Sequence, residues 1–255
     1  MITHAIPPAT PPKGGAEPAA IELPDGVSVL WQDAHLALVL KPSGMLSVPG
    51  RGPDKQDCLS ARLAHAGLPS VVVHRLDQAT SGLMLFARSA EVQRQLSHAF
   101  AQRQVNKQYL ACVAGHLPPS DDWQRIDAPI AADWPRRPLR IVADNGQSSQ
   151  TLWRSLGART GQTKQGATSG TWLVLRPLSG RTHQLRVHLQ HIGHPIWGDA
   201  LYAPPDVCAC APRLMLHAQR LAFTHPATGQ PLDFANMPEG WLPPMALQRC
   251  EALPW

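Results

Sequence analysis

The sequence lacks any run of apolar residues long enough to cross a membrane, which takes at least ~18. No basic stretch followed by an apolar one opens the chain, so no secretory signal peptide is expected. Heptads and repeats of roughly 20–50 residues are also absent, which argues against coiled-coil and solenoid architectures. We therefore expect a globular, cytoplasmic protein.

Cysteine is scarce and follows no recognisable pattern. The five cysteines form no CxxC pair or zinc-knuckle spacing: Cys58, Cys112, Cys208, Cys210 and Cys250. Their odd number and scatter predict reduced thiols, as in a cytoplasmic protein. Cys208 and Cys210 could hold a metal ion only with ligands from distant parts of the chain, so no cysteine metal site is predicted.

Charged residues are few, at 16% of the chain against 44% hydrophobic residues, so most of the chain should fold around a sizeable core. The formal net charge is +5, and the 23 basic residues comprise 18 arginines and 5 lysines. This balance suits a polyanionic partner without establishing one. The excess of arginine favours planar, bidentate contacts with phosphate or carboxylate groups.

The apolar pattern predicts short strands with few helices. Residues 1–20 are rich in Pro, Ala and Gly, so a disordered tail is expected there and one folded domain over 21–255. The expected strands are Val27–Trp31, Leu36–Leu40, Val71–Val73, Leu83–Ala87, Tyr109–Ala114, Thr151–Leu156 and Thr171–Arg176. Helices are expected at Leu59–His65 and after caps at Ser89 and Thr182. Loops are expected at Gly115–Arg140 and at Gly157–Gly170, the latter a mobile hairpin loop without catalytic weight.

A polar loop joins two of these strands. It reads His74-Arg75-Leu76-Asp77 and continues to Gly82, which permits a turn before the second strand. A carboxylate two residues from a guanidinium, on a loop held by strands, is typical of rigid scaffolds that present reactive groups. The same pattern is compatible with a charged hairpin tip at which Arg75 and Asp77 face the solvent.

Three other segments carry candidate functional residues. The strand Leu36–Leu40 is followed by a tight turn, Lys41-Pro42-Ser43-Gly44. Tyr109 stands on a strand in the segment NKQYLACV, where core packing is the alternative role. The segment ADWPRRP places Arg136 and Arg137 beside an aromatic residue, which suits phosphate contact and base stacking. It also suits a solvated loop anchored by its tryptophan.

The last candidate segment, LSGRTHQLRVHLQHIGHPIWGDALY, begins at Leu178. Thr182 is expected to cap a helix whose apolar face includes Leu185, which places Arg181 at the helix N-terminus. Four histidines raise the alternative of a metal site: His183, His188, His191 and His194. Their positions drift around a helix and no Asp or Glu stands among them, so no metal is predicted.

Together these segments resemble the RluA family of RNA pseudouridine synthases. HRLD-x-x-TSG, which stands here without a substitution, is the signature of the family's catalytic loop. The KP-x-G turn, the strand NKQYLACV, and GR-x-HQLR-x-H followed by G-x-PI-x-GD-x-x-Y match further family motifs. The resemblance covers about Trp31 to Pro226, with the motifs in the family's order.

The resemblance implies an α+β pseudouridine synthase fold, with a largely antiparallel mixed sheet, flanking helices and a central active-site cleft. It implies that Asp77 is the catalytic carboxylate and that Arg181 pairs with it and keeps it ionised. Tyr109 would stack on the base and help to remove the C5 proton. Arg75 would fill the space left by the flipped uridine, and Leu185 would pack beside the uracil. No cofactor is implied, because the isomerisation involves neither redox chemistry nor added energy.

The passages LKPSGMLSVPGR, ADWPRRP and APRLMLHA carry a finer similarity to the branch of the family that modifies both tRNA and 23S rRNA. No S4 RNA-binding domain precedes the motifs, so catalysis and RNA recognition are expected to share one domain, with Arg136 and Arg137 on the RNA. The expected activity is uridine isomerisation in a tRNA anticodon loop and a 23S rRNA hairpin, by a monomer. An rRNA-only enzyme, a non-catalytic RNA-binding module and a nucleic-acid glycosidase remain as alternatives, although a glycosidase usually needs a second carboxylate.

Overall fold

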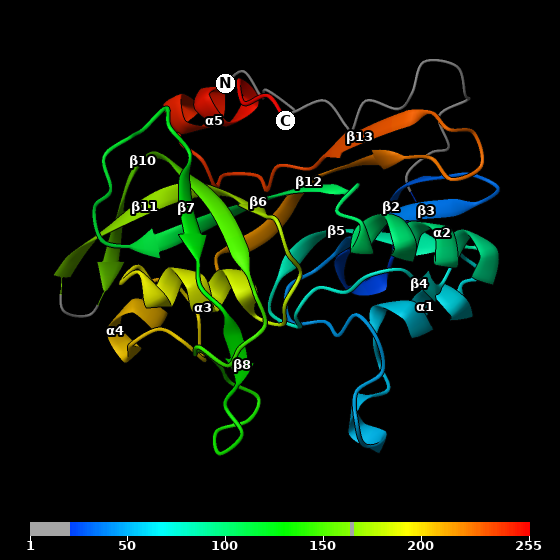
Figure 1. Cartoon of the computed structure of the whole chain (residues 1–255), viewed down its shortest axis with the longest axis horizontal. Helices are drawn as coiled ribbons and strands as arrows, with labels where there is room; N and C mark the ends of the chain where they lie inside the picture. The colour runs from blue at the N-terminus through cyan, green and yellow to red at the C-terminus, as the bar shows by residue number, and fades with distance from the viewer. Residues whose placement is uncertain (1–20, 164–165) are drawn as a thin grey trace. The chain divides into compact units, whose positions relative to one another are not determined.

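The computed structural model describes residues 21–163 and 166–255, so the tail expected over residues 1–20 lies outside the described residues. The chain forms two compact units, whose elements are labelled in Figure 1. The N-terminal unit runs to Lys107 and also contains Ala218–Pro238. The C-terminal unit contains Gln108–His217 and Glu239–Trp255. No helix among the described residues is long and apolar enough to span a bilayer.

The N-terminal unit is built on strands in the order β1-β2-β3-β5-β12, with β4 paired to β5 and β13 to β12. Antiparallel pairing joins β1 to β2, β2 to β3, β3 to β5, β4 to β5, and β12 to β13. The strands are β1 Ile21–Leu23, β2 Val27–Gln32, β3 Leu36–Lys41, β4 Val71–Val72, β5 Ser81–Ala87, β12 Leu216–Thr224 and β13 Pro231–Ala235. Its helices are α1 Leu59–His65 and α2 Ala90–Ala101, with short 3₁₀ turns at Pro24–Gly26 and Pro53–Lys55.

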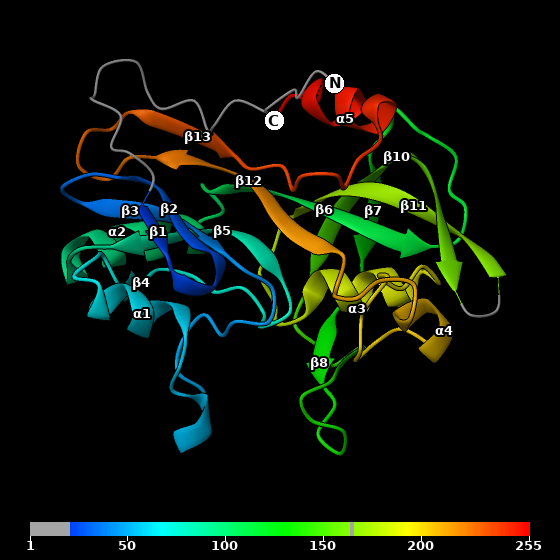
Figure 2. The same ribbon diagram turned by 180° about the vertical axis from the view of Figure 1, so that it is seen from behind.

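Helix α2 shows how the sequence builds the core of this unit. Ser89 caps the helix as expected, because its hydroxyl oxygen accepts a hydrogen bond from Val92 N at 3.2 Å. Val92 and Leu96 are buried in one apolar cluster with Leu38 of β3 and Leu85 of β5. Figure 2 shows α2 beside β4 and β5. Burial of each such side chain contributes about 1.5–3 kcal/mol. The helix therefore packs on β5, the strand that follows the candidate catalytic loop.

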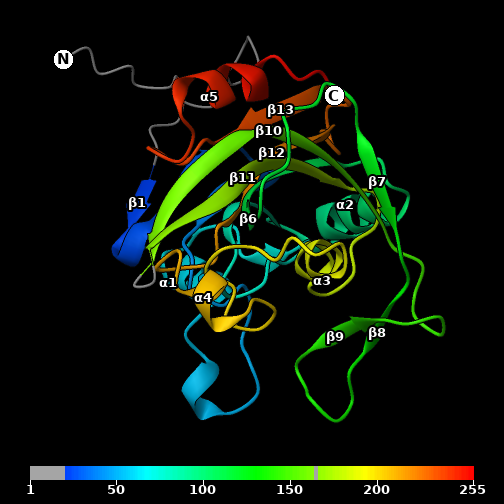
Figure 3. The same ribbon diagram turned by 90° about the vertical axis from the view of Figure 1, so that its left-hand side faces the viewer.

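The C-terminal unit contains antiparallel strands paired in the order β6-β11-β10-β7, and a separate two-stranded sheet of β8 and β9 (Figure 3). Its strands are β6 Asn106–Ala114, β7 Gln124–Asp127, β8 Ile130–Ala132, β9 Arg140–Val142, β10 Gln150–Thr163 and β11 Gly166–Pro177. Its helices are α3 Gln184–His191, α4 Pro205–Cys208 and α5 Pro244–Glu251. The observed mixed α+β architecture, with a mostly antiparallel sheet, confirms the expected fold class.

The segment Gly157–Gly170 is not the loop that its composition predicts. Strands β10 and β11 continue through it, and their pairing reaches Thr163 opposite Gly166. The prediction is wrong because antiparallel pairing uses backbone groups, which polar and small residues supply as well as apolar ones. The register shifts between Ser155 and Gly157, and Gly157 has a φ of 134°, so a β-bulge lies where the apolar pattern stops.

Two other segments differ from their expected structure. The region Gly115–Arg140, predicted as loop, contains β7, β8 and the first residue of β9. These strands of three or four residues are too short to give an apolar period. The resemblance also implies a closing helix near Pro212–Ala218, but this stretch leads directly into strand β12, which begins at Leu216.

Candidate active site

The loop that carries Asp77 is fixed to the earlier KPSG turn by a buried lysine. Lys41 is fully buried, and its Nζ donates to the carbonyl oxygens of Pro42 at 2.8 Å, Met45 at 2.7 Å and Gln78 at 3.1 Å. These three acceptors match the three donors of an ammonium group, so the charge is buried with its hydrogen bonds made. Lys41 thereby ties the residue after Asp77 to a turn that lies far away in the sequence.

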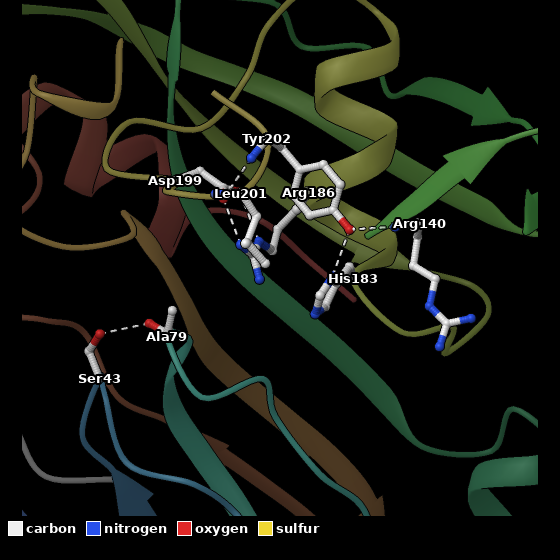
Figure 4. Close-up of polar contacts among 8 residues, drawn as sticks. All are labelled: Ser43, Ala79, Arg140, His183, Arg186, Asp199, Leu201 and Tyr202. Carbon is white, nitrogen blue, oxygen red and sulfur yellow. Dashed lines mark hydrogen bonds and ion pairs between the residues drawn. The ribbon is translucent and has the colours of Figure 1, made fainter. Parts of the chain in front are cut away.

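Two serines also hold this loop, one before Asp77 and one after it. Ser47 Oγ donates to Leu76 O at 2.7 Å and accepts from Leu76 N at 3.2 Å. Ser43 Oγ donates to Ala79 O at 2.7 Å (Figure 4). The backbone is therefore anchored both before and after Asp77, whose side chain is half-buried. A reactive carboxylate needs this kind of fixed support.

His74, at the start of the loop, is fixed in a neutral form. Its Nε2 accepts a hydrogen bond from Leu85 N at 3.0 Å, so the ring proton lies on Nδ1. Its ring stacks on Phe100 of α2, with ring centroids 4.6 Å apart. Burial, and secondarily the charge of Lys107, lowers the pKa of His74 to about 3. His74 therefore connects the loop to β5 and α2 without adding charge beside Asp77.

Gly82 is required where the loop enters β5. Its φ is 122°, a value that L side chains rarely adopt. A Cβ atom at this position would lie 2.3 Å from the carbonyl oxygen of Ala218 in β12. The TSG part of the motif is therefore needed for the close approach of two backbones as well as for the turn.

Tyr109 lies in the C-terminal unit, on β6 opposite Leu175 of β11. It is half-buried, whereas its neighbours Gln108 and Leu110 are buried. The strand therefore presents the Tyr109 ring at a partly open surface, which does not match a role in core packing alone.

Arg181 precedes helix α3 in the same unit and is exposed. Its Nε donates to Ser148 O at 3.3 Å, and its backbone N donates to Gln184 Oε1 at 3.0 Å. Among the described residues its other guanidinium nitrogens have no hydrogen-bond partner. The expected cap at Thr182 is wrong: His183 is the N-cap residue, at a φ of 57° and without a side-chain cap bond. The Gln184 side chain bonds to the preceding loop instead.

A buried chain of neutral hydrogen bonds supports α3. Gln184 Nε2 donates to Thr151 Oγ1 at 3.0 Å, and this hydroxyl lies 2.9 Å from His188 Nδ1. His188 Nε2 lies 2.9 Å from Ala128 O, an acceptor, so the ring proton is on Nε2. Burial lowers the pKa of His188, which keeps the ring neutral. Leu185, expected beside the uracil, is only 6% exposed.

A buried ion pair holds the end of the same motif. Arg186 contacts both carboxylate oxygens of Asp199, at 2.8 Å from Nε and 2.6 Å from Nη2. Asp199 Oδ1 also accepts hydrogen bonds from the backbone N atoms of Leu201 and Tyr202. The Tyr202 hydroxyl reaches His183 Nδ1 at 2.6 Å (Figure 4). The sequence contained Asp199 and Tyr202 in the motif GD-x-x-Y and His183 and Arg186 in the motif GR-x-HQLR-x-H, but nothing in it showed what they contact.

Three of the four histidines that raised the idea of a metal site have hydrogen-bond partners in the protein. His183 and His188 are engaged as above, and His194 Nδ1 lies 2.8 Å from Ala114 O. Across residues 21–163 and 166–255, no three His, Cys, Asp or Glu side chains form a group that could hold a metal. The five cysteines are free thiols, and burial raises the pKa of Cys112 to about 12.

The two candidate RNA-binding arginines differ from each other in their contacts. Arg136 forms an ion pair with Asp133, at 2.6 Å, although its side chain is 70% exposed. Arg137 lies over the ring of Trp134, 3.7 Å from its centroid, and Trp134 is 69% exposed. Both stand on the loop that joins β8 to β9. Arg137 and Trp134 thus form an exposed cation–π pair on this loop.

The predicted site residues fall in both units. Arg75 and Asp77 belong to the N-terminal unit, and Tyr109, Arg136, Arg137, Arg181 and Leu185 to the C-terminal unit. Sequence reasoning missed the residues that fix the backbone: Lys41, Ser43, Ser47 and His74. Their position inside or beside the quoted motifs was the only feature of the sequence that could have indicated a role for them.

A model of the RNA pseudouridylate synthase family matches residues 35–191. The chain belongs to this family. The matched range includes the HRLD loop, Tyr109 and Arg181. The expected family is thus confirmed, and the protein is an isomerase that forms pseudouridine in RNA.

Curated relatives within the family are similar over most of the chain. The dual-specificity RNA pseudouridine synthase RluA of Yersinia pestis is 44% identical over 207 residues, covering 81% of this chain and 96% of the relative. RluA of Escherichia coli strain K12 is 42% identical, covering 81% and 90%. In the solved structure of human RNA Pseudouridylate Synthase Domain Containing 1, the match has a TM-score of 0.69 and 25% identity, covering 90% of this chain and 96% of that one. Human RNA Pseudouridylate Synthase Domain Containing 4 shares the fold, with a TM-score of 0.62 and 24% identity over 88% and 92% of the two chains.

Proposed function

We propose that this pseudouridine synthase modifies uridines in both tRNA and 23S rRNA, with Asp77 as its catalytic carboxylate. The observation that carries the assignment of Asp77 is the double anchorage of its loop, by Ser47 on Leu76 and by Lys41 on Gln78. A charged tip that only faced solvent would not require buried polar groups on both sides. The family match supports the assignment, because the matched range, residues 35–191, includes this loop.

The reaction breaks the N1–C1′ bond, turns the uracil and joins C5 to C1′. The Asp77 carboxylate could attack the sugar, add to the base, or take the C2′ proton, and all three need the ionised form. We propose that Arg181 acts with Asp77 and favours that form through a charge-assisted hydrogen bond. Two guanidinium nitrogens of Arg181 have no hydrogen-bond partner within residues 21–163 and 166–255, and they support this role because their donors are available.

The target uridine must leave its stack before a carboxylate can reach its sugar and base. We assign Arg75, which is exposed and two residues from Asp77, to the space that the uridine vacates. Tyr109 would stack on the extruded base and assist removal of the C5 proton. Its half-buried position on β6 supports this assignment, since part of the residue remains accessible. Leu185 would pack against the uracil.

Two substrates are proposed because the similar curated relatives are named dual-specificity enzymes. We propose a tRNA anticodon loop and a 23S rRNA hairpin, since loops offer bases that can be splayed out. The exposed Arg137–Trp134 pair supports RNA contact by the β8–β9 loop. The proposal includes a monomeric state and a cytoplasmic location, where both RNAs are found.

The test is to incubate the protein with a short stem-loop that copies the anticodon arm, labelled with tritium at uridine C5, and with 23S rRNA. Pseudouridine and tritium release from both RNAs support the proposal. If the stem-loop is not modified while 23S rRNA is, the protein is an rRNA-only enzyme and the proposed dual specificity is wrong. Free uracil would indicate a glycosidase, and binding without any product would indicate a non-catalytic RNA-binding module.

A further inference from the structure

Arg140, the first residue of β9, carries a guanidinium that has no carboxylate partner among the described residues. Its Nε is buried and has no hydrogen-bond partner in the same part of the chain. Four other arginines of the same unit are paired with carboxylates: Arg125 with Asp127, Arg136 with Asp133, Arg154 with Asp121, and Arg186 with Asp199. A buried donor without a partner costs roughly 1–3 kcal/mol, so native structures rarely keep one. The orphaned Nε therefore indicates an acceptor that is supplied from outside the chain.

The backbone of Arg140 is fixed by Tyr202 and by strand pairing. Its N–H donates to the Tyr202 hydroxyl at 2.9 Å, and the residue pairs with Ala132 of β8. The same hydroxyl reaches His183 Nδ1, two residues after Arg181 (Figure 4). The Tyr202 hydroxyl therefore links the backbone of Arg140 to His183, the N-cap residue of α3.

Tyr202 is itself held in place. Asp199 Oδ1 accepts from Tyr202 N at 3.2 Å, and the Arg186 guanidinium lies 5.0 Å from the centre of the Tyr202 ring. The Arg186–Asp199 pair is almost fully buried, with side chains 4% and 0% exposed. The phenol that positions Arg140 thus rests on a buried ion pair, which limits its movement.

Arg140 shares one face of β9 with an apolar residue. Val142, two residues along β9, points to the same face of the strand, because side chains alternate along a strand. Val142 packs on a buried cluster of Ile130, Val187 and Tyr202. Arg140 therefore lies on the face of β9 that packs on this cluster.

We propose that Arg140 is a phosphate-binding residue for the RNA backbone, positioned by the Tyr202 hydroxyl. A phosphodiester oxygen supplies the acceptor that Nε lacks, and the planar guanidinium suits two-point contact with phosphate. Such a contact sets the register of the RNA without reading its sequence. Arg140 stands on the same hairpin as Arg136 and Arg137, so the RNA strand would follow β8 and β9 toward α3. This inference rests on the proposed function for one point, that the ligand is RNA.

The first experiment compares Arg140→Gln with a matched loss of charge, Arg125→Gln. Arg125 lies on β7, is exposed and is already paired with Asp127. The dissociation constant of the anticodon stem-loop is measured from about 50 to 300 mM salt, with thermal unfolding of each variant as a check on folding. Arg140→Gln should weaken binding at least about fivefold and lower the slope of log K against log salt by ~0.7–0.9. Arg125→Gln should change neither quantity, and single-turnover rate at saturating RNA should stay within about twofold of wild type for both.

The second experiment tests positioning by Tyr202. Tyr202→Phe keeps the ring but removes the hydroxyl that holds Arg140 N, so it should weaken RNA binding in the wild-type background. It should have no further effect in the Arg140→Gln background, because both changes remove the same contact. Arg140→Lys keeps the charge but loses Nε and the fork, and should bind with intermediate affinity.

Three results would overturn the inference. Equal affinities and salt slopes in Arg140→Gln and Arg125→Gln would mean that water satisfies the buried Nε. Full additivity of Tyr202→Phe and Arg140→Gln would remove the positioning role. Loss of turnover at saturating RNA with unchanged affinity would place Arg140 in the chemistry instead. Should wild-type protein bind RNA with the expected slope but form no pseudouridine, the proposed function fails while the phosphate contact stands.

Discussion

Ser47 Oγ makes two hydrogen bonds to Leu76, one to its carbonyl oxygen at 2.7 Å and one from its backbone N at 3.2 Å. One hydroxyl thus satisfies both backbone groups of the residue before Asp77. Ser47 and Leu76 are both buried, so water cannot replace either bond. The position of the catalytic loop therefore depends on a side chain that makes no contact with substrate in the proposed mechanism.

Ser47→Ala should lower single-turnover rate at saturating RNA by at least about tenfold and leave RNA affinity nearly unchanged. It should also destabilise the fold by roughly 1–3 kcal/mol, because two buried backbone groups lose their partner. Ser28→Ala is the matched control, since Ser28 Oγ bonds to Glu22 in the same unit, away from the loop. A variant with normal turnover would show that the loop keeps its position without Ser47.

Arg181→Met should reduce turnover by at least two orders of magnitude, because the Asp77 carboxylate would lose its charge-assisted partner. Arg181→Lys should recover part of the loss, since lysine keeps the charge but lacks the planar fork. The measurement is the single-turnover rate of each variant at saturating RNA. Full activity in Arg181→Met would show that Arg181 and Asp77 are not coupled.

Stability should fall in mildly acidic solution because of His74. The pKa of this buried ring is lowered from 6.5 to about 3 in the folded protein. The unfolded chain therefore binds the proton more readily, so the stabilising contribution is complete above pH 6.5 and is lost as the pH falls toward 3. The melting temperature of wild type should drop more steeply between pH 7 and pH 4 than that of His74→Gln. Parallel curves for the two proteins would contradict a buried neutral imidazole.

Substitution of the two arginines of the β8–β9 loop should have different effects, one on thermal stability and the other on RNA affinity. Arg136→Ala leaves the buried Asp133 carboxylate without its partner, so it should lower the melting temperature. Arg137→Ala should leave the melting temperature unchanged and weaken RNA binding, because Arg137 contacts only the exposed Trp134 ring within the described residues. The double variant should weaken binding more than it slows single-turnover chemistry at saturating RNA. Unchanged affinity in the double variant would remove the loop from the RNA interface.

Apolar patterning predicted most elements correctly because their burial follows directly from their composition. Strand β5 is buried along its whole length and helix α2 begins at the expected cap. The extension of β10 and β11 could not be predicted, since backbone pairing leaves no trace in side-chain composition. His183 was equally unpredictable as a helix cap, because its left-handed backbone depends on the contacts of Tyr202 and Gln184.

The sequence predicted the candidate site residues that belong to recognised motifs, but not the side chains that hold them in place. The residues Arg75, Asp77, Tyr109 and Arg181 follow from the family resemblance alone, because spacing allows them ordinary structural roles. The supports of the Asp77 loop join positions about 30 to 40 residues apart, such as Ser47 with Leu76 and Lys41 with Gln78. Contacts of this kind arise only when the chain folds, so a single sequence does not show them.

The most direct test of the account is the activity of Asp77→Asn. Asparagine keeps the shape of the side chain but cannot carry the charge that all three possible roles of the carboxylate require. The measurement is pseudouridine formed in the anticodon stem-loop under single-turnover conditions, together with the RNA dissociation constant. The account predicts no detectable product, with affinity within about tenfold of wild type, or ~1.4 kcal/mol. Turnover above about one per cent of wild type would contradict Asp77 as the catalytic group.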